Sequence, residues 1–569
     1  MKIDKIVIKL FLSIILISFT SCLQDFLELD DDNHPNVDYI YTDPPAAEGV
    51  LLNGYLLLPT SYTMEEASTD DAVNNVIGNP ASTMATGGWA SNFNPLSVWD
   101  YAYRSLFYLN TFLDINKKVV WATDNRNSPA AERSEQFRKR FRGEALALRA
   151  WANFELLKKH GGIDAEGNPM GPILIDQIIE AGMDINFPRT TYDDYVESIL
   201  NDLEEAIELL PDEYYNIEAD LVHNAVWGIQ NRNRVNGNFA KALKSRVTLF
   251  VASQSLHDNP DKWADAANAA AILLESIEGV SGLSSTGHVF WRNMNDPEII
   301  FRRDFVTNNT LEQANFPPSL FGQGQINPTQ NFVDAFPMSN GFPIDHDESG
   351  YNPDNPYISR DPRLSLYVLY DGALGGAIRT NIENEPNGLG RTVTSTKTGY
   401  YLYKLLDPNI SVNPVGPTTS NHFQTVFRYT EIFLNYAEAA NEAWGPNSDP
   451  NGFGFTPVEI IAQIRARAGI SQPDNYLSSV SSSKELLRDL IRNERRIELA
   501  FEGFRFWDIR RWDFNLNEPA KGIEISDAEN TKTIFNVESR DYESYMKYGP
   551  IPYSETLKNP NLIQNSGWK

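Results

Sequence analysis

The pattern of hydrophobic and polar positions predicts helices over much of the chain. Between residues 192 and 210 a hydrophobic residue recurs every fourth position with acidic residues between, as in a helix packed on one side: Tyr195, Ile199, Leu203 and Ile207. A similar stripe covers residues 141–152 and stops before Gly161-Gly162. Alanine-rich segments at 241–253 and 263–277 predict two more helices that can approach each other closely. We therefore expect residues from about 46 to 276 to form mainly helices joined by turns.

The helical period fails between residues 279 and 422, where Asn, Pro, Gly, Tyr and Phe dominate. We expect irregular structure with short strands there, and a loop-rich stretch of this length is usually functional. The helical pattern returns at 428–444 and at 486–501, and Thr456-Pro457 is typical of a helix start that leads to a stop at Gly469. The predicted fold class is mainly α, with a large irregular insertion.

The first residues predict export. Lys2, Lys5 and Lys9 precede an apolar run that ends in Thr20-Ser21, the layout of a secretory signal peptide over residues 1–21. The run is shorter than the ~20 residues that a membrane-spanning helix needs. Cys22 is the single cysteine, so no disulfide within the chain is expected, and its position resembles a bacterial lipobox whose sulfur is acylated. Residues 22–45 would then be a lipidated cysteine and acidic tether, anchored by several acyl chains.

Charge and motifs narrow the chemistry. The formal net charge is -28 and the pI is near 4.7, which disfavours nucleic acid as a partner. The seven histidines have no metal-ligand spacing, and no nucleophile elbow, Walker loop or dinucleotide motif is present, so no cofactor or metal is expected; a surface calcium stays open. A glycosidase would need two carboxyl groups that flank a sugar bond, and no motif selects such a pair. The sequence thus gives no sign of catalysis.

Several motifs in order resemble the SusD/RagB family of outer-membrane nutrient-binding lipoproteins of Bacteroidetes. They are Gly143-Glu144-Ala145 with Leu148-Arg149-Ala150 and Gly161-Gly162, Phe187-Pro188-Arg189-Thr190, Pro328-Thr329-Gln330 with Asp334-Ala335-Phe336, Arg360-Asp361-Pro362-Arg363, Arg428-Tyr429-Thr430-Glu431, the segment from Ile464 to Gly469, that from Glu494 to Trp512, and that from Pro550 to Trp568. The resemblance runs from Cys22 to Trp568. Lys159-His160 in place of an aromatic residue before the paired glycines, and a short insert at 164–170, depart from the family pattern only in loops.

The resemblance implies a tetratricopeptide-repeat-like helical scaffold, with an N-terminal part at 46–278 and a C-terminal part at 279–569 that carries the irregular ligand region. It also implies a surface-exposed lipoprotein of the outer membrane that binds a glycan and delivers it to a SusC-like TonB-dependent transporter, without catalysis. Three alternatives stay open: binding of peptides in the RagB manner, a glycosidase, and a pure protein scaffold. The charged motifs have a structural interpretation, because signs alternate at helical spacing from Glu494 to Arg511 and favour ion pairs within the chain. By the same reasoning we expect Arg465 and Arg467 to pair with those acids, residues 360–363 to form a salt-bridged turn, and residues 550–568 to pack on the core.

A glycan site needs exposed aromatic rings to stack on the apolar face of a sugar, with amides or charged groups to bind its hydroxyls. Two segments outside the matched motifs have that mixture, at 87–95 and 288–325. The predicted ligand residues are Trp89, Asn92, Asn94, Trp291, Arg292, Asn293, Phe316, Phe321 and Gln323. The alternative is that Trp89 and Trp291 fill the core beneath their loops. Trp99 and Tyr103 we assign to the core, because they lie on the helix predicted to begin near Pro95.

Overall fold

The structure is a computed structural model that describes residues 37–123, 129–253, 260–381, 385–526 and 531–569. The predicted signal peptide and Cys22 lie outside the described residues. The helices before residue 279 are α2 (Pro44–Leu52), α3 (Pro80–Ala85), α4 (Trp99–Ile115), α5 (Ala130–His160), α6 (Tyr192–Leu209), α7 (Leu221–Trp227), α8 (Gly237–Ala252) and α9 (Pro260–Glu275). Those that follow are α10 (Thr310–Asn315), α11 (Gln330–Ala335), α12 (Arg363–Tyr367), α13 (Ala373–Gly376), α14 (Tyr429–Trp444), α15 (Pro457–Arg467), α16 (Asn475–Val480), α17 (Lys484–Glu498), α18 (Arg505–Arg511) and α19 (Tyr553–Lys558).

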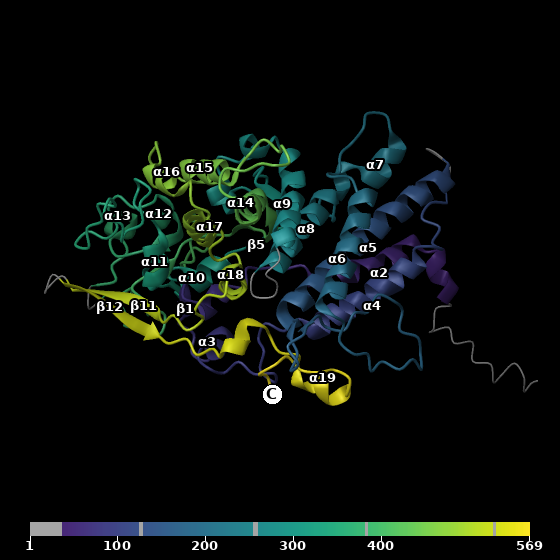
Figure 1. Ribbon diagram of the computed structural model, residues 1–569, viewed down its shortest axis with the longest axis horizontal. Helices are drawn as coiled ribbons and strands as arrows, with labels where there is room; N and C mark the ends of the chain where they lie inside the picture. The colour runs from purple at the N-terminus through teal and green to yellow at the C-terminus, as the bar shows by residue number, and fades with distance from the viewer. Residues whose placement is uncertain (1–36, 124–128, 254–259, 382–384, 527–530) are drawn as a thin grey trace, which may run out of the picture.

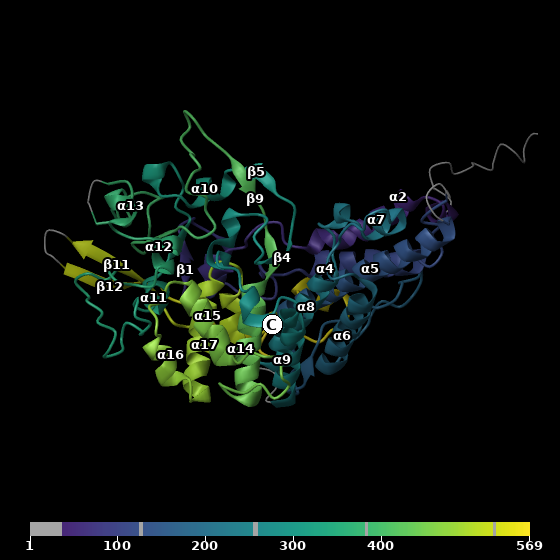
Figure 2. The same cartoon turned by 90° about the horizontal axis from the view of Figure 1, so that it is seen from above.

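The long helices pack one against the next: α4 on α5, α5 on α6, α6 on α8, α8 on α9, α9 on α14, and α14 on α17. The N-terminal helices occupy one end of the molecule, and the loop-rich part with α10 to α13 occupies the other (Figure 1, Figure 2). The stack confirms the mainly helical scaffold predicted from the sequence. The prediction for 486–501 was wrong at its end, because α17 stops at Glu498 and Phe501 then takes a left-handed backbone with φ of 61°.

Short antiparallel strand pairs organise the loop-rich part, as the sequence led us to expect. In the described residues the pairs are β1 (Ala72–Asn74) with β6 (Ile326–Pro328), β2 (Gly162–Ile163) with β3 (Pro169–Met170), β4 (Ile299–Arg302) with β10 (Thr425–Arg428), β5 (Val306–Asn308) with β9 (Ser420–His422), β7 (Val368–Leu369) with β8 (Tyr401–Leu402), and β11 (Ala520–Ser526) with β12 (Thr531–Glu538). Most of these pairs join segments far apart in sequence, so each fixes one loop against another.

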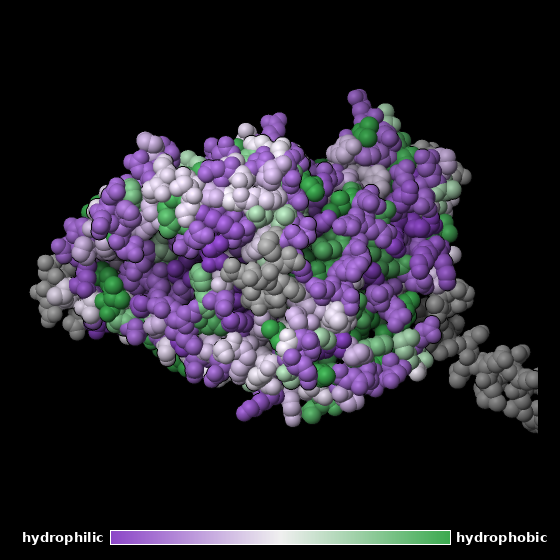
Figure 3. Space-filling view, in the orientation of Figure 1, coloured by the Kyte–Doolittle hydropathy of each residue, from purple (hydrophilic) through white to green (hydrophobic). Residues whose placement is uncertain are grey.

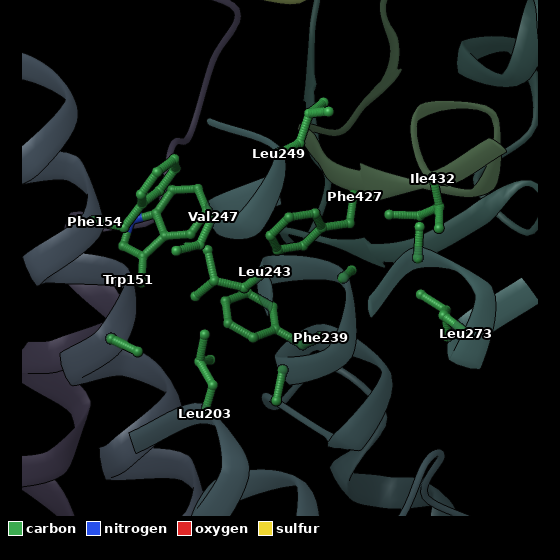
Figure 4. Packing of buried hydrophobic residues seen from close by; sticks show 14 of the residues in the cluster. Trp151, Phe154, Leu203, Phe239, Leu243, Val247, Leu249, Leu273, Phe427 and Ile432 are labelled. Atoms are coloured by element: carbon green, nitrogen blue, oxygen red, sulfur yellow. The ribbon is translucent and has the colours of Figure 1, made fainter. Parts of the chain in front are cut away.

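The main hydrophobic core lies between the stacked helices and continues across residue 279. It includes Trp151 of α5, Phe239 of α8, Leu273 of α9 and Ile432 of α14, all nearly or fully buried (Figure 4). The ring of Phe427 on β10 lies 5.1 Å from that of Phe239 in an edge-to-face arrangement. The two predicted parts, 46–278 and 279–569, therefore share one core; the boundary between them stays a prediction.

A buried ion-pair network holds the loop-rich part on the C-terminal helices, which confirms the structural interpretation of the charged motifs. Arg363 lies 2.6 Å from Asp361 and 3.0 Å from both Glu494 and Glu498, with all four side chains fully buried. Since carboxylates and guanidinium groups pair so closely here, these charges do not form a phosphate site. Other members extend the network: Arg465 with Glu494 at 2.8 Å, Arg467 with Glu498 at 3.1 Å, and Arg428 with Glu298 at 2.9 Å.

The C-terminal segment packs on the core, as predicted. Ile551 and Trp568 are buried, and His160 Nδ1 donates to the carbonyl oxygen of Pro550 at 2.7 Å. Asn565 donates to the carbonyl oxygen of Gly549 at 2.7 Å and to that of His160 at 3.2 Å. The residue that interrupts the family pattern, His160, is thus a buried link between α5 and the C-terminal segment.

Candidate ligand-binding face of the loop-rich region

Phe321 presents an exposed aromatic ring in the loop-rich part, as stacking requires. The 3-10 turn Pro318–Leu320 ends at Phe321, whose backbone has φ of 65° and ψ of 16° and whose side chain is 53% exposed. Its amide donates to Pro318 O at 2.9 Å, and the next amide, of Gly322, donates to Pro317 O at 3.2 Å. A left-handed backbone costs a non-glycine residue about 1–2 kcal/mol. The turn therefore holds a large ring in solvent at an energetic cost, which is frequent at functional sites.

Neutral polar side chains lie close to Phe321 along the chain and on the neighbouring segment. Gln313 and Gln323 are exposed and carry side-chain amides on neighbouring segments. The backbone N–H of Gln323 donates to the backbone carbonyl oxygen of Gln313 at 2.9 Å and so joins these segments. Ser319 is exposed and is fixed by Asn387, whose side chain accepts from its amide at 2.9 Å and donates to its hydroxyl at 2.7 Å. We call the surface made by Gln313, Ser319, Phe321, Gln323, Thr392 and Thr394 the Phe321 face.

The two threonines belong to this face because residues 392–394 lie against the turn after Phe321. A Cβ atom on Gly324 would lie 2.5 Å from the carbonyl oxygen of Thr394, and Gly324 has φ of 53°. Only glycine fits there. The hydroxyls of Thr392 and Thr394 are 3.0 Å apart. The face thus combines an exposed ring with amides and hydroxyls, groups that bind neutral hydroxylated ligands.

Residues 291–293, at the start of the second predicted segment 288–325, are the other candidate part of the ligand site. Trp291 is half-buried, and its indole Nε1 donates to Leu406 O at 3.3 Å. Arg292 and Asn293 are exposed, and the Arg292 guanidinium lies 5.9 Å from the centre of the Trp291 ring. Trp291 is thus anchored on its polar edge, Arg292 is exposed beside it, and the Asn293 side chain accepts from the amide of Asn295 at 3.1 Å.

A small hydrophobic cluster connects residues 291–293 with the Phe321 face. It consists of Phe316, Leu406, Ile410 and Val412, with Leu320 and Tyr403 packed against it. Leu320 precedes Phe321, and Leu406 accepts the hydrogen bond from Trp291. The prediction for Phe316 as a ligand residue was wrong, because its side chain is 3% exposed and forms this cluster instead.

A hydrogen bond between His422 and Glu312 connects the segments beneath this region. His422 Nε2 donates to Glu312 at 2.9 Å, and the same carboxylate oxygen accepts from the amide of Asp407 at 2.9 Å. The hydrogen bond to Glu312 raises the pKa of His422 above its ordinary value. This contact ties α10 and β9 to the loop after Leu406.

Trp89 is a core residue, which corrects its assignment to the ligand. It is 3% exposed, its ring centre lies 5.0 Å from that of Trp568, and the Arg510 guanidinium lies 5.4 Å from it. Its Nε1 donates to Asn94 Oδ1 at 3.1 Å, so the Asn94 carbonyl is used to hold the loop. The C-terminal segment and α18 cover this ring, which confirms the alternative that Trp89 fills the core. Asn92 is exposed, and its role stays a prediction.

Within the described ranges, no group of three or more His, Cys, Asp or Glu side chains could hold a metal ion. No helix of the described residues has the length and apolar character needed to cross a membrane. Figure 3 shows a mostly hydrophilic surface over the loop-rich part, with hydrophobic residues gathered beside α6 and α8. The sequence pattern did not indicate Gln313, Ser319, Thr392 or Thr394, because single amides and hydroxyls in loops form no motif.

Family models match both parts of the chain. Residues 297–568 match the model described as "SusD family", and residues 26–231 match one described as "Starch-binding associating with outer membrane". A SusD-like protein of Formosa agariphila is 22% identical over 522 residues, which are 88% of this chain and 83% of that protein. A second SusD-like protein of the same organism is 30% identical over 142 residues, 24% of each chain. The chain therefore belongs to the SusD family.

Solved structures of SusD-like proteins have the same fold. One from Bacteroides fragilis superposes with a TM-score of 0.71 at 23% identity, over 95% of this chain and 99% of that chain. A SusD-like carbohydrate binding protein from the same organism has a TM-score of 0.70 at 21% identity, over 92% and 99%. A laminarin binding SusD-like protein has a TM-score of 0.58 at 19% identity, over 93% and 100%.

Proposed function

We propose that this protein binds a glycan at the outer face of the outer membrane and delivers it to a SusC-like TonB-dependent transporter. The observation that carries the proposal is membership of the SusD family, with both family models matched in order along the chain. The SusD-like carbohydrate binding protein and the laminarin binding SusD-like protein share the fold of this chain. They support an oligosaccharide or polysaccharide as the ligand class. The protein acts by binding and not by catalysis.

The Phe321 face is the proposed glycan site, together with Trp291, Arg292 and Asn293. A sugar ring would stack its C–H face on Phe321, and the amides of Gln313 and Gln323 would bind its hydroxyls. Arg292 would reach a carboxylate, a sulfate or a hydroxyl on a neighbouring sugar. The site is open, so it suits an internal stretch of a long chain.

The anchor and the transporter complete the proposal. The family model that matches residues 26–231 is described as associating with the outer membrane, which supports an attachment there. Cys22 would carry the lipid, residues 22–45 would act as the tether, and the repeat-like helices of residues 46–278 would contact the transporter. The ligand face lies in the part from 279 to 569, so glycan binding and transporter contact would use different surfaces.

The test is retardation of the protein in native gels that contain polysaccharides of different classes. The variant Phe321→Ala should lose about tenfold in affinity, since an aromatic stacking partner contributes about 1 kcal/mol beyond its buried area. Phe107→Ala is the matched control, because Phe107 is 50% exposed on α4 and Phe321 is 53% exposed. Both variants should melt close to the unchanged protein, since neither ring is buried.

Three results would contradict the proposal. Turnover of a polysaccharide would identify a glycosidase, and binding of peptides alone would favour a RagB-like ligand. Equal affinity of Phe321→Ala and Phe107→Ala would place the glycan site elsewhere.

A further inference from the structure

A cavity of about 290 Å³ lies where the N-terminal helices meet the C-terminal part. The end of α5 and the C-terminal half of α8 form one wall, and the segment from Gln424 through β10 forms another. The start of α18 and the segment 57–65 complete it. The Phe321 face contributes no residue to this lining, so the cavity is a separate site.

The cavity is lined by buried polar atoms that lack hydrogen-bond partners. The indole Nε1 of Trp151 and the Oε1 of Gln424 are unpartnered, and these residues are 4% and 7% exposed. Thr425 is 8% exposed, and its hydroxyl lies next to that of Tyr62, with no other polar group of the described residues bonded to either. A buried polar group without a partner costs about 1–3 kcal/mol. Several of them around one cavity therefore point to a bound molecule that satisfies them.

The charged groups of the lining are already paired with each other. Arg246 forms an ion pair with Glu431 at 2.6 Å, and Arg428 does so with Glu502 at 2.8 Å. Glu155 accepts from Lys158 at 2.6 Å. These pairs neutralise one another, and the carboxylate of Glu65, which also lines the cavity, accepts a hydrogen bond from the Trp507 indole at 3.0 Å. The polar groups without partners are neutral: an N–H donor, an amide oxygen and two hydroxyls.

Aromatic rings form much of the remaining wall. Trp151 and Phe154 lie next to each other on α5 (Figure 4), and the lining also includes Phe250, Phe504 and Trp507. Apolar faces of this kind are poor neighbours for a cluster of waters. They suit a molecule that has an apolar face and a polar rim.

We propose that this cavity binds one neutral sugar ring, held by Trp151, Gln424, Thr425 and Tyr62. Its volume is roughly twice the ~150 Å³ of a cavity that takes a benzene-sized molecule, which leaves room for the hydroxyls of the sugar. The ring would contact the aromatic wall with its C–H face. The choice of a sugar as the ligand rests on the proposed function, whereas the position of the cavity does not. Because the partners come from both sides of residue 279, the sugar would also link the two parts of the chain.

The experiment is a calorimetric titration of the full protein, in which the heat of binding is measured. The sugars are D-glucose, D-galactose, D-mannose and N-acetyl-D-glucosamine at millimolar concentrations. We expect binding of one molecule per chain for at least one of these sugars. Trp151→Phe removes the N–H and keeps an aromatic ring, and Thr425→Val removes the hydroxyl in the same shape. Each should weaken the affinity about fivefold to tenfold, the effect of one hydrogen bond.

Trp99→Phe is the matched control, because Trp99 is a buried tryptophan outside this cavity. If Trp151→Phe fails to fold, Thr425→Val decides, since it replaces an unpartnered hydroxyl by a methyl group. Failure of all four sugars to bind a protein that is still retarded by polysaccharides would overturn the inference and leave the proposed function intact. Binding that is lost in Phe321→Ala but kept in the cavity variants would also overturn it. Binding of a single sugar without any retardation by polysaccharides would refute the proposed function alone.

Discussion

Glu66 is a carboxyl group that the fold keeps out of water. It lies on the 3-10 turn Glu65–Ser68 and is 0% exposed. The amide of Gly503 donates to its Oε1 at 3.0 Å, whereas its Oε2 has no partner. Burial raises the pKa of Glu66 to about 8, although the backbone hydrogen bonds oppose the shift. The folded protein therefore holds Glu66 in its neutral form at pH 7.

This pKa gives the stability a pH dependence of known sign. Between the unfolded pKa of 4.5 and the folded pKa of about 8, the unfolded chain loses a proton that the folded chain keeps. The contribution of the neutral Glu66 carboxyl to the free energy of unfolding is fully present below pH 4.5 and is lost as the pH rises through 8. Glu66→Gln does not titrate, so it should be more stable than the unchanged protein by about 2 kcal/mol or more at pH 8, and similar at pH 4.5.

Urea unfolding at both pH values measures this difference. Glu208→Gln is the control, because Glu208 is exposed on α6 and should leave the pH profile unchanged. Parallel pH profiles for Glu66→Gln and the unchanged protein would show that Glu66 is ionised in the fold.

At the scale of elements, Arg363 joins α12 to α17. Its guanidinium contacts Asp361 of the preceding turn and both Glu494 and Glu498 of α17. Burial opposes ionisation of Glu498, but Arg467 and Arg363 hold the pKa of its carboxyl well below the usual range. Removal of one cation would therefore leave buried carboxylates without a counter-charge.

We expect Arg363→Met to lower the free energy of unfolding by about 3–5 kcal/mol, the usual effect of breaking a buried ion pair. Urea unfolding measures the loss, with Arg104→Met as the control because Arg104 is exposed on α4. A loss no greater than that of the control would mean that the network adds nothing to stability.

The elements with local signals were predictable from the sequence. The helix predicted for 192–210 is α6, and Thr456 forms the expected cap, with a capping box to Glu459, because such patterns depend on neighbours along the chain. Trp89 and Phe316 were assigned wrongly, since the groups that bury them come from residues 506–568 and 406–412. The cavity was missed for the same reason. Its unpartnered atoms belong to residues 62, 151, 424 and 425, and no local pattern relates them.

At the scale of the whole molecule, the shared core makes the two parts of the chain one unit. Helix α9 packs on α14, and the strand pair β4–β10 lies against α8. Two family models match the chain separately, yet the buried residues of one cluster come from both. Packed side chains therefore hold the N-terminal helices and the loop-rich part together.

The attachment to the membrane can be tested on the whole protein in cells. Cys22→Ala removes the sulfur that would carry the acyl chains, so the variant should move from the outer-membrane fraction to the soluble fraction and should lose labelling by an alkyne fatty acid. Several acyl chains hold a protein on a bilayer because each buried CH₂ contributes ~0.8 kcal/mol, and without them the acidic chain has no attraction to an anionic surface.

Ser18→Ala is the control within the signal segment and should stay labelled. Affinity for glycans should be the same in both purified variants, since Cys22 lies outside the proposed ligand face. A Cys22→Ala protein that still fractionates with membranes and keeps its label would show that the anchor lies elsewhere.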